Sequence, residues 1–338
     1  MQFISELSLF ALKTLLIAGS IIVVAGFVFQ MNSVRSKSRN QIDVEKLNSR
    51  FRSFRQHLQS YLLSKRDFKI LMKAEKKAGK KEDGAKPGRV FVVDFDGDIR
   101  ATATGSLREE ITAILSVAKP DDEVVVRLES GGGLVTSYGL AAAQLERLKA
   151  EKIKLVVCVD KVAASGGYMM ACVADRILAA PFAVVGSIGV IAQIPNFNRL
   201  LKRADVDYRE VTAGEFKRTV TVFGEITAAG LEKFKEQIES THGLFKSFVI
   251  KHRPKLDLSK VATGEHWYGQ PSLDLGLIDE ILTSDEYLYR RMANADVFKI
   301  QYNTRKKWLE RLSEAASVAM YRALIKIWSD LDRTKLEL

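Results

Sequence analysis

The chain has 338 residues, enough for one large core with appendages, and its 47% hydrophobic and 28% charged content is ordinary for a globular protein. The net charge of +11 is concentrated between Arg35 and Lys86, where 16 Lys/Arg face 6 Asp/Glu. The rest of the chain is near neutral, which argues against a basic nucleic-acid-binding fold. Cys158 and Cys172 lie in apolar runs and are expected to be buried free thiols.

The first predicted element is an apolar helix over 7–29, which carries one charge, Lys13. As a helix it would be about 34 Å long, enough for the roughly 30 Å hydrocarbon layer of a bilayer. A cleaved signal peptide fits poorly, because Glu6 is the first charge and no small-residue cleavage site follows the apolar run. Residues 1–34 are therefore predicted to be an uncleaved membrane anchor.

Residues 35–87 are predicted to be a basic tether. Apolar residues at spacings of three and four between Leu47 and Leu62 predict an amphipathic helix, and 73–86 is typical of a flexible linker. The positive charge suits contact with anionic lipid head groups, and a solvated linker is the alternative.

From Gly88 onward, apolar strands alternate with helices. Strands are predicted over 89–95, 123–128, 154–159 and 176–179, with helices over 107–118, 134–149 and 167–174. This alternation predicts an α/β domain over 88–295 with largely parallel pairing. A long amphipathic helix is predicted over 228–251.

The last region, 296–338, is predicted to be a tail with an amphipathic helix over 306–331. Its apolar side chains lie broadly on one face, and they are Trp308, Leu309, Leu312, Ala316, Ala319, Leu324, Ile327 and Trp328. Packing on its own domain or on a neighbouring subunit is one interpretation. Binding at a membrane surface is the other, because of the two tryptophans.

Ser165 lies among small residues at a predicted strand-to-helix junction, where a nucleophile would have room for a substrate backbone. A plain helix N-cap explains the same pattern. The four histidines do not form a triad pattern, and the chain has no Gly-x-Ser-x-Gly elbow. Lys217 is the candidate base, provided that an apolar pocket keeps its amine neutral; an exposed strand lysine is the simpler interpretation.

The glycine run 130–133 follows a strand and precedes a helix, so its N–H groups can face an anion. A nucleotide P-loop is excluded because no Gly-Lys-Ser/Thr follows, and the spacing does not match a dinucleotide fingerprint. The open interpretations are an oxyanion turn, which uses Gly132 and Gly133, and an ordinary glycine-rich turn. Metal-ligand spacings are absent from the sequence.

Three ordered motifs, at 160–168, 186–190 and 213–218, resemble the signal peptide peptidase (SppA) family of bacterial inner-membrane peptidases. The resemblance implies a Clp-protease/crotonase-like fold of repeated ββα units. It implies Ser165 as the nucleophile, Lys217 as the general base and Ser187 as a hydrogen-bonding partner of the lysine. N–H groups around Gly132 and Gly166 would form the oxyanion hole.

The resemblance further implies a serine endopeptidase without a cofactor, which cleaves extended apolar peptides such as signal-peptide remnants or membrane-protein fragments through an acyl-enzyme. A single copy of the domain implies a ring-like homo-oligomer with composite sites. Gly131 stands where the family usually has proline, which loosens the turn. A catalytically weak or inactive oligomeric scaffold is therefore the alternative; an acyl-CoA enzyme lacks candidate acidic residues.

The membrane face of the catalytic domain is left open by the sequence. Arg35, Lys37 and Arg39 follow the apolar helix and favour a cytoplasmic domain. The resemblance favours the periplasmic side of the inner membrane.

Overall fold

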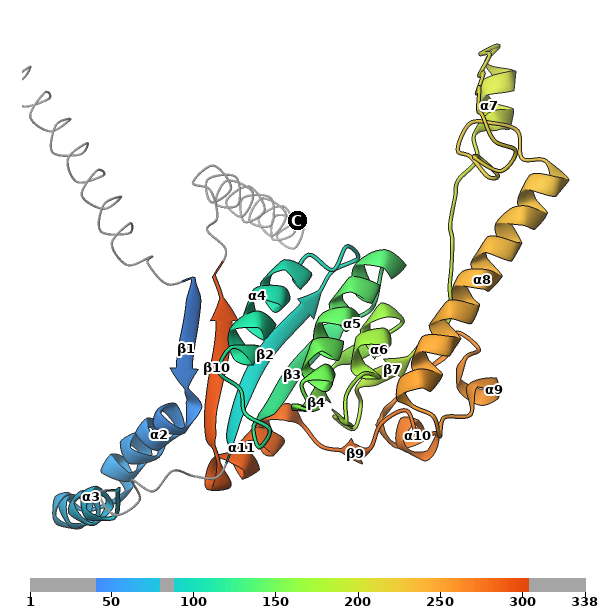
Figure 1. Cartoon of the computed structure of the whole chain (residues 1–338). Helices are drawn as coiled ribbons and strands as arrows, with labels where there is room; N and C mark the ends of the chain where they lie inside the picture. The colour runs from blue at the N-terminus through green and yellow to red at the C-terminus, as the bar shows by residue number, and fades with distance from the viewer. Residues whose placement is uncertain (1–40, 80–87, 304–338) are drawn as a thin grey trace, which may run out of the picture. The chain divides into compact units, whose positions relative to one another are not determined.

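A computed structural model describes residues 41–79 and 88–303 (Figure 1). The predicted membrane anchor and the predicted helix of the tail lie outside these ranges. Within 41–79 and 88–303, none of the helices combines the length and the hydropathy needed to cross a bilayer. The α/β alternation predicted from Gly88 onward is confirmed.

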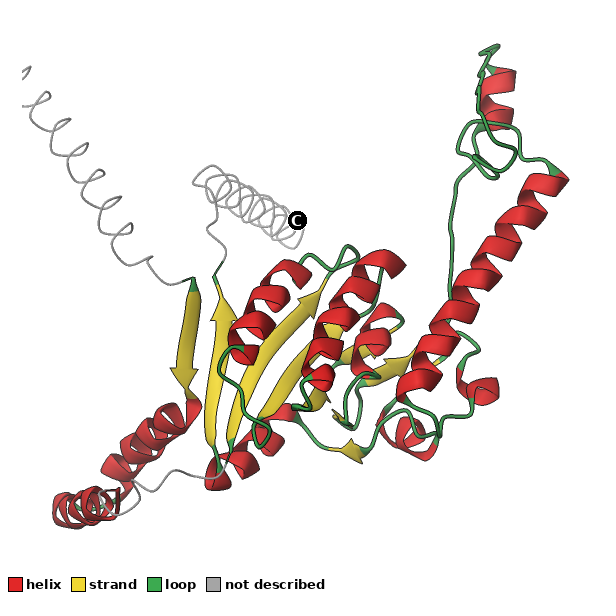
Figure 2. Ribbon diagram, in the orientation of Figure 1, coloured by secondary structure: helices red, strands yellow, loops and turns green. Residues whose placement is uncertain are grey.

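Within the described residues, ten strands form one sheet, which Figure 2 shows in yellow. In chain order they are β1 (Ile42–Lys46), β2 (Arg89–Gly97), β3 (Glu123–Ser130), β4 (Lys154–Val159), β5 (Val162–Ala164), β6 (Arg176–Ala179), β7 (Val184–Gly186), β8 (His266–Trp267), β9 (Glu280–Ile281) and β10 (Asp296–Tyr302). Both faces of the central strands β2 and β3 are covered, which is why each contains a continuous run of apolar residues that does not alternate with polar ones.

The helices alternate with these strands. They are α2 (Leu47–Leu62), α3 (Lys65–Gly79), α4 (Thr104–Leu115), α5 (Val135–Ala150), α6 (Gly166–Ala171), α7 (Asn198–Arg203), α8 (Ala228–His252), α9 (Leu258–Val261), α10 (Gly269–Asp274) and α11 (Ser284–Asn294). Side-chain caps at the start of helices include Thr227, which accepts the N–H of Gly230 before α8, and Thr283, which accepts the N–H of Glu286 before α11. Asp257 caps α9 by accepting the N–H of Ser259.

The main path of the sheet runs β1-β10-β2-β3-β4-β6-β9. All of these pairs are parallel except β1 with β10. A short branch leaves the path where Ser130, the last residue of β3, pairs with Ala163 of β5. The strand β5 then pairs with β7, and β7 pairs antiparallel with β8. This branch carries the candidate nucleophile to the carboxyl end of β3.

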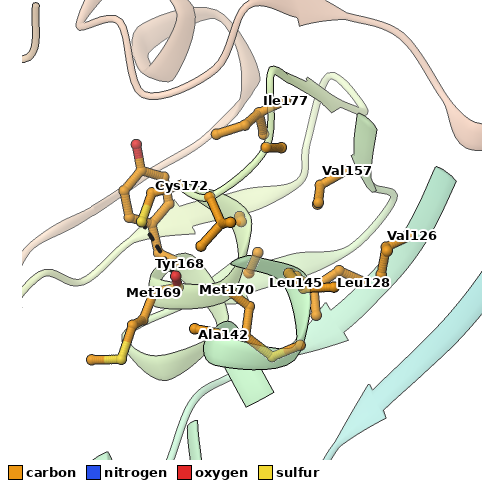
Figure 3. Packing of buried hydrophobic residues seen from close by; sticks show 14 of the residues in the cluster. Val126, Leu128, Ala142, Leu145, Val157, Tyr168, Met169, Met170, Cys172 and Ile177 are labelled. Atoms are coloured by element: carbon orange, nitrogen blue, oxygen red, sulfur yellow. Dashed lines mark hydrogen bonds between the residues drawn. The ribbon is translucent and has the colours of Figure 1, made fainter. Parts of the chain in front are cut away.

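Apolar side chains pack on both faces of the sheet. The larger cluster lies between the strands and α4, α5 and α6, and it includes Leu128, Leu145 and Tyr168 (Figure 3). The smaller cluster joins the other face to Leu47 of α2 and to Tyr287 and Leu288 of α11. Cys158 and Cys172 are buried free thiols, as predicted, and burial raises the pKa of both.

Two strands come from ranges predicted to be tether and tail. Ile42–Lys46 forms the edge strand β1, and Asp296–Tyr302 forms β10 between β1 and β2. Neither strand was predicted from the sequence, because β1 directly precedes a basic helix and β10 directly precedes the tail. The sheet therefore begins before residue 88 and ends after residue 295.

A largely exposed arm, defined as residues 189–227, connects the sheet to α8. Phe197 and Phe223 pack together with ring centroids 6.3 Å apart, and the Phe197 N–H donates to Val222 O at 2.7 Å. Several apolar side chains of the arm stay in solvent, and Val211 is 97% exposed. Only the C-terminal half of α8 is anchored in the core, through Phe245 and Val249.

Candidate active site

Strand register brings three of the predicted motifs together. Ser130 pairs with Ala163, which sets the glycine turn 131–133 beside the end of β5. Ala164 pairs with Gly186, which sets Ser165 beside Ser187. The Ser165 N–H donates to Gly186 O at 2.8 Å and so extends this pairing by one residue. Residues 57 positions apart in the sequence thus meet at one edge of the sheet.

Ser165 has a backbone conformation that L-residues rarely adopt, with φ 52° and ψ −117°. Such strain persists only where the surrounding structure enforces it, and it is concentrated at functional sites. The residue lies between β5 and α6, yet its side chain makes no capping hydrogen bond. Ser165 therefore occupies the N-cap position of α6, as the alternative expected, but its hydroxyl does not cap the helix. The residue is half-buried, and its hydroxyl makes no hydrogen bond within the described residues.

Gly132 approaches Ser165 closely enough to exclude any side chain. A Cβ added at Gly132 would lie 2.7 Å from Ser165 Cβ, 2.7 Å from Gly166 N and 2.8 Å from Ala164 O. The φ of Gly132 is +89°, which also favours glycine. Gly166 is constrained independently, because its added Cβ would lie 2.4 Å from the Tyr138 ring. The glycines thus let the turn pack directly on the nucleophile loop.

Ser187 has a left-handed φ of 53° and follows β7 directly. Its N–H donates to Glu265 O at 2.6 Å, which ties the residue to the segment before β8. Gly186 is covered by Trp267, because an added Cβ would lie 2.8 Å from that ring. Ser187 is therefore held beside Ser165 by backbone contacts and leaves its hydroxyl available.

Lys217 lies on the exposed arm, where its N–H donates to Gly214 O at 3.2 Å. In the described residues its amine makes no ion pair and no hydrogen bond to Ser165 or Ser187. The structure of the single chain therefore brings together Ser165, Ser187, Gly132 and Gly166, and it does not join Lys217 to them.

Comparison with known proteins shows the family to which this chain belongs. The family model "Peptidase family S49 N-terminal" matches residues 2–145, and "Peptidase family S49" matches residues 147–298. A probable protease SohB of Haemophilus influenzae is 48% identical over 322 residues, which is 91% of this chain and 91% of that protein. The chain belongs to peptidase family S49.

One further curated protein and one solved structure are also similar to this chain. A probable protease SohB of Buchnera aphidicola is 52% identical over 240 residues, or 71% of each chain. A solved membrane-bound stomatin-specific protease with a substrate peptide is similar to 68% of this chain and 98% of its own, with a TM-score of 0.37 and 14% identity.

The histidines of this S49 peptidase have other partners. His242 Nε2 lies 3.2 Å from Ile188 O, and His252 Nε2 lies 3.0 Å from Glu146 Oε1. Burial lowers the pKa of His252 although Glu146 opposes that shift. None of the described histidines hydrogen-bonds Ser165, and the described residues hold no cluster suited to a metal ion.

One residue of the candidate site was not predicted from the sequence, namely Tyr138 of α5. The fully buried hydroxyl of Tyr138 donates to Asp98 O at 2.7 Å and lies 2.5 Å from Ser130 Oγ. Ser130 Oγ in turn accepts the N–H of Gly132 at 3.0 Å. This chain of hydrogen bonds anchors the glycine turn in the core. A tyrosine on a predicted buried helix face was the available signal, since its hydroxyl needs a partner there.

Proposed function

We propose that this S49 peptidase is a membrane-anchored serine endopeptidase that hydrolyses peptide bonds through an acyl-enzyme. Ser165 Oγ attacks the scissile carbonyl, Lys217 accepts the hydroxyl proton, and the protonated amine then supplies a proton to the leaving amine. Ser187 orients the lysine amine. Water subsequently releases the acyl group. The substrates are extended apolar peptides, and the domain is of the Clp-protease/crotonase type.

One observation carries this proposal. The strained Ser165, with no hydrogen bond to its hydroxyl among the described residues, lies at the meeting point of the glycine turn and Ser187. A serine that served packing alone would not require left-handed backbone at both Ser165 and Ser187. A small-residue surface beside the hydroxyl leaves room for a peptide backbone.

The exposure of Lys217 supports a composite site. A lysine amine is a base only when neutral, and removal from water favours the neutral form. In the single chain Lys217 is exposed, on an arm that also exposes Val211 and Phe216. We propose that arms and sheets of neighbouring chains pack together in a ring-like homo-oligomer. That contact buries the apolar side chains and brings one chain's Lys217 to another chain's Ser165.

The oxyanion hole is proposed to use N–H groups of Gly132 and Gly166. The Gly132 N–H donates to Ser130 Oγ in this conformation, so binding of the oxyanion requires that hydrogen bond to be exchanged. If the Gly132 N–H always stays bonded to Ser130 Oγ, it cannot stabilise an oxyanion, and the protein would be the catalytically weak or inactive scaffold.

The decisive experiment compares Ser165→Ala and Lys217→Ala in the assembled protein, with an apolar fluorogenic peptide and an active-site serine probe. Both variants should lose nearly all hydrolysis, and Ser165→Ala should lose labelling. The controls Ser106→Ala, a half-buried serine in α4, and Lys235→Ala, an exposed lysine in α8, should retain activity. Full activity in either dyad variant contradicts the mechanism, whereas absence of labelling in the wild type favours the scaffold.

Mixing the two inactive variants tests the composite site. If Ser165 and Lys217 come from different chains, mixed oligomers contain some intact pairs and regain part of the activity. If both come from one chain, each polypeptide lacks one member and the mixture stays inactive. The second result would refute the inter-subunit arrangement while leaving the Ser/Lys chemistry in place.

We propose an inner-membrane location, with residues 7–29 as a single span and the basic tether against anionic lipid. The catalytic domain is assigned to the periplasmic face on the family resemblance. Protease added to spheroplasts should then digest the domain without lysis. Protection until lysis would place it in the cytoplasm, as the basic flank of the span favours.

A further inference from the structure

An apolar groove lies along the edge of the sheet, on the face that carries α4. Its volume is about 340 Å³. Two side chains each from β1, β10 and the α4 region dominate its lining, and they are Ile42, Val44, Phe298, Ile300, Ile114 and Val117. Val44 is 54% exposed and Val117 is 53% exposed. Strands of α/β sheets are normally covered on both faces, so this groove is an uncovered part of a core.

A buried carboxyl group lies where β10 ends. Glu110 of α4 is 4% exposed, and its Oε1 accepts the Tyr302 N–H at 2.7 Å. Its Oε2 is buried without a hydrogen-bond partner in the part of the chain that the structure describes. Burial raises the pKa of Glu110 to about 7, although the Tyr302 N–H opposes that shift. A buried carboxylate oxygen without a donor costs free energy, so a donor from a segment that enters here would stabilise the ionised form.

The chain itself continues from this point. Tyr302 pairs with Ile42, and Asn303 is the last described residue. The next residues include three consecutive cations at 305–307 and then the apolar stripe that begins at Trp308 and Leu309. Cationic side chains within a few residues of Tyr302 are suitable donors to Glu110 Oε2.

We propose that residues 304–338 fold back over this groove in the same chain, with the predicted helix antiparallel to β10 and next to α4. Seven residues of β10 span about 23 Å, which about 16 helical residues cover. The first half of the stripe, Trp308 to Ala319, thus fills the groove, while a residue of 305–307 pairs with Glu110.

The N-terminal segment reaches the same end of β1 but fits the groove less well. Residues 7–29 are apolar all round, so docking would leave an apolar face in water. The tail has one apolar stripe and a charged opposite face, which matches a groove open on one side. The docked tail would cover the exposed face of β1 and β10. This groove is distinct from the candidate peptidase site.

The test compares Val44→Asp with the matched control Ile70→Asp in the full chain, in detergent. Ile70 lies in α3, outside the groove, and is 58% exposed, so both changes replace a half-exposed apolar side chain. A carboxylate in the groove opposes docking. We expect trypsin to cleave after Arg311 and Arg322 about tenfold faster or more in Val44→Asp, and at the wild-type rate in Ile70→Asp. The tryptophan emission should shift to the red in Val44→Asp alone, because Trp308 leaves the groove.

A double variant, Val44→Cys with Leu312→Cys, identifies the chain that supplies the tail. A disulfide within one polypeptide, without a covalent dimer, supports the proposal. Equal cleavage of the wild type and both aspartate variants overturns it. A covalent dimer overturns it in favour of a second copy. Protection of the tail that appears only with anionic vesicles overturns it in favour of a lipid surface.

Discussion

Replacement of Gly132 by alanine tests whether close packing of the glycine turn on Ser165 is needed for peptidase activity. The new Cβ would lie 2.7 Å from both Ser165 Cβ and Gly166 N, and 2.8 Å from Ala164 O. Two of these atoms belong to the backbone, so no side-chain rotation relieves the contact. Either the turn or the nucleophile loop must move.

Two effects lower the stability of the Gly132→Ala variant. An alanine at a left-handed φ costs about 1 kcal/mol or more relative to glycine, and overpacking in a tight site costs about 1–3 kcal/mol in addition. We expect Gly132→Ala to lower the free energy of unfolding by about 2–4 kcal/mol. A displacement near 1 Å at the reacting atoms reduces activity about 100-fold, so kcat/KM should fall by about that factor.

Gly131→Ala is the matched control. An added Cβ at Gly131 meets nothing within 4 Å, and its φ lies outside the left-handed region. This variant should keep wild-type stability and kcat/KM. Urea unfolding and hydrolysis of an apolar fluorogenic peptide provide the two readouts. Equal losses in the two variants, or wild-type kcat/KM in Gly132→Ala, would refute the reasoning.

Three further variants test other contacts. Tyr138→Phe removes the hydroxyl between Asp98 O and Ser130 Oγ, and we expect a loss of about 1–2 kcal/mol in urea unfolding with several-fold lower kcat/KM. Asp160→Ala removes the acceptor of the Ser284 N–H at 2.8 Å, and the free energy of unfolding should fall by about 1–3 kcal/mol with little change in activity. Asp122→Asn should flatten the dependence of stability on pH below about 4, as measured by urea unfolding between pH 2.5 and 7.

The sign of the Asp122 effect follows from its surroundings. Burial pushes the pKa of this carboxyl up, but hydrogen bonds from Arg89 and the Lys119 N–H hold the pKa below its ordinary value. The ionised group therefore stabilises the fold above the unfolded pKa, and this contribution is lost as the pH falls through the folded pKa. If Asp122→Asn left the dependence of the unfolding free energy on acidic pH unchanged, this assignment would be contradicted.

For Tyr138→Phe, an unchanged kcat/KM would contradict the expected role of its hydroxyl in anchoring the glycine turn.

Local patterns in the sequence were sufficient for the alternation of strands and helices. Continuous apolar runs identified β2, β3 and β4, and apolar spacings of three and four identified α2 and α8. The short strands β1 and β10 were missed because their pairing depends on partners more than 200 residues away. Tyr138 was missed although its partners are nearer in the sequence, because its role depends on how the fold places its hydroxyl between Ser130 Oγ and Asp98 O.

The sequence by itself determined the α/β class, the small-residue setting of Ser165 and the motifs shared with a peptidase family. Only the tertiary structure decided that Ser165 is strained and does not cap α6 with its hydroxyl, that Gly132 contacts it, and that Lys217 lies on an exposed arm. Periodicity and residue size are local properties that a chain displays directly. Register, left-handed backbone and exposure are consequences of distant segments packing together, so they exist only once the sheet has formed.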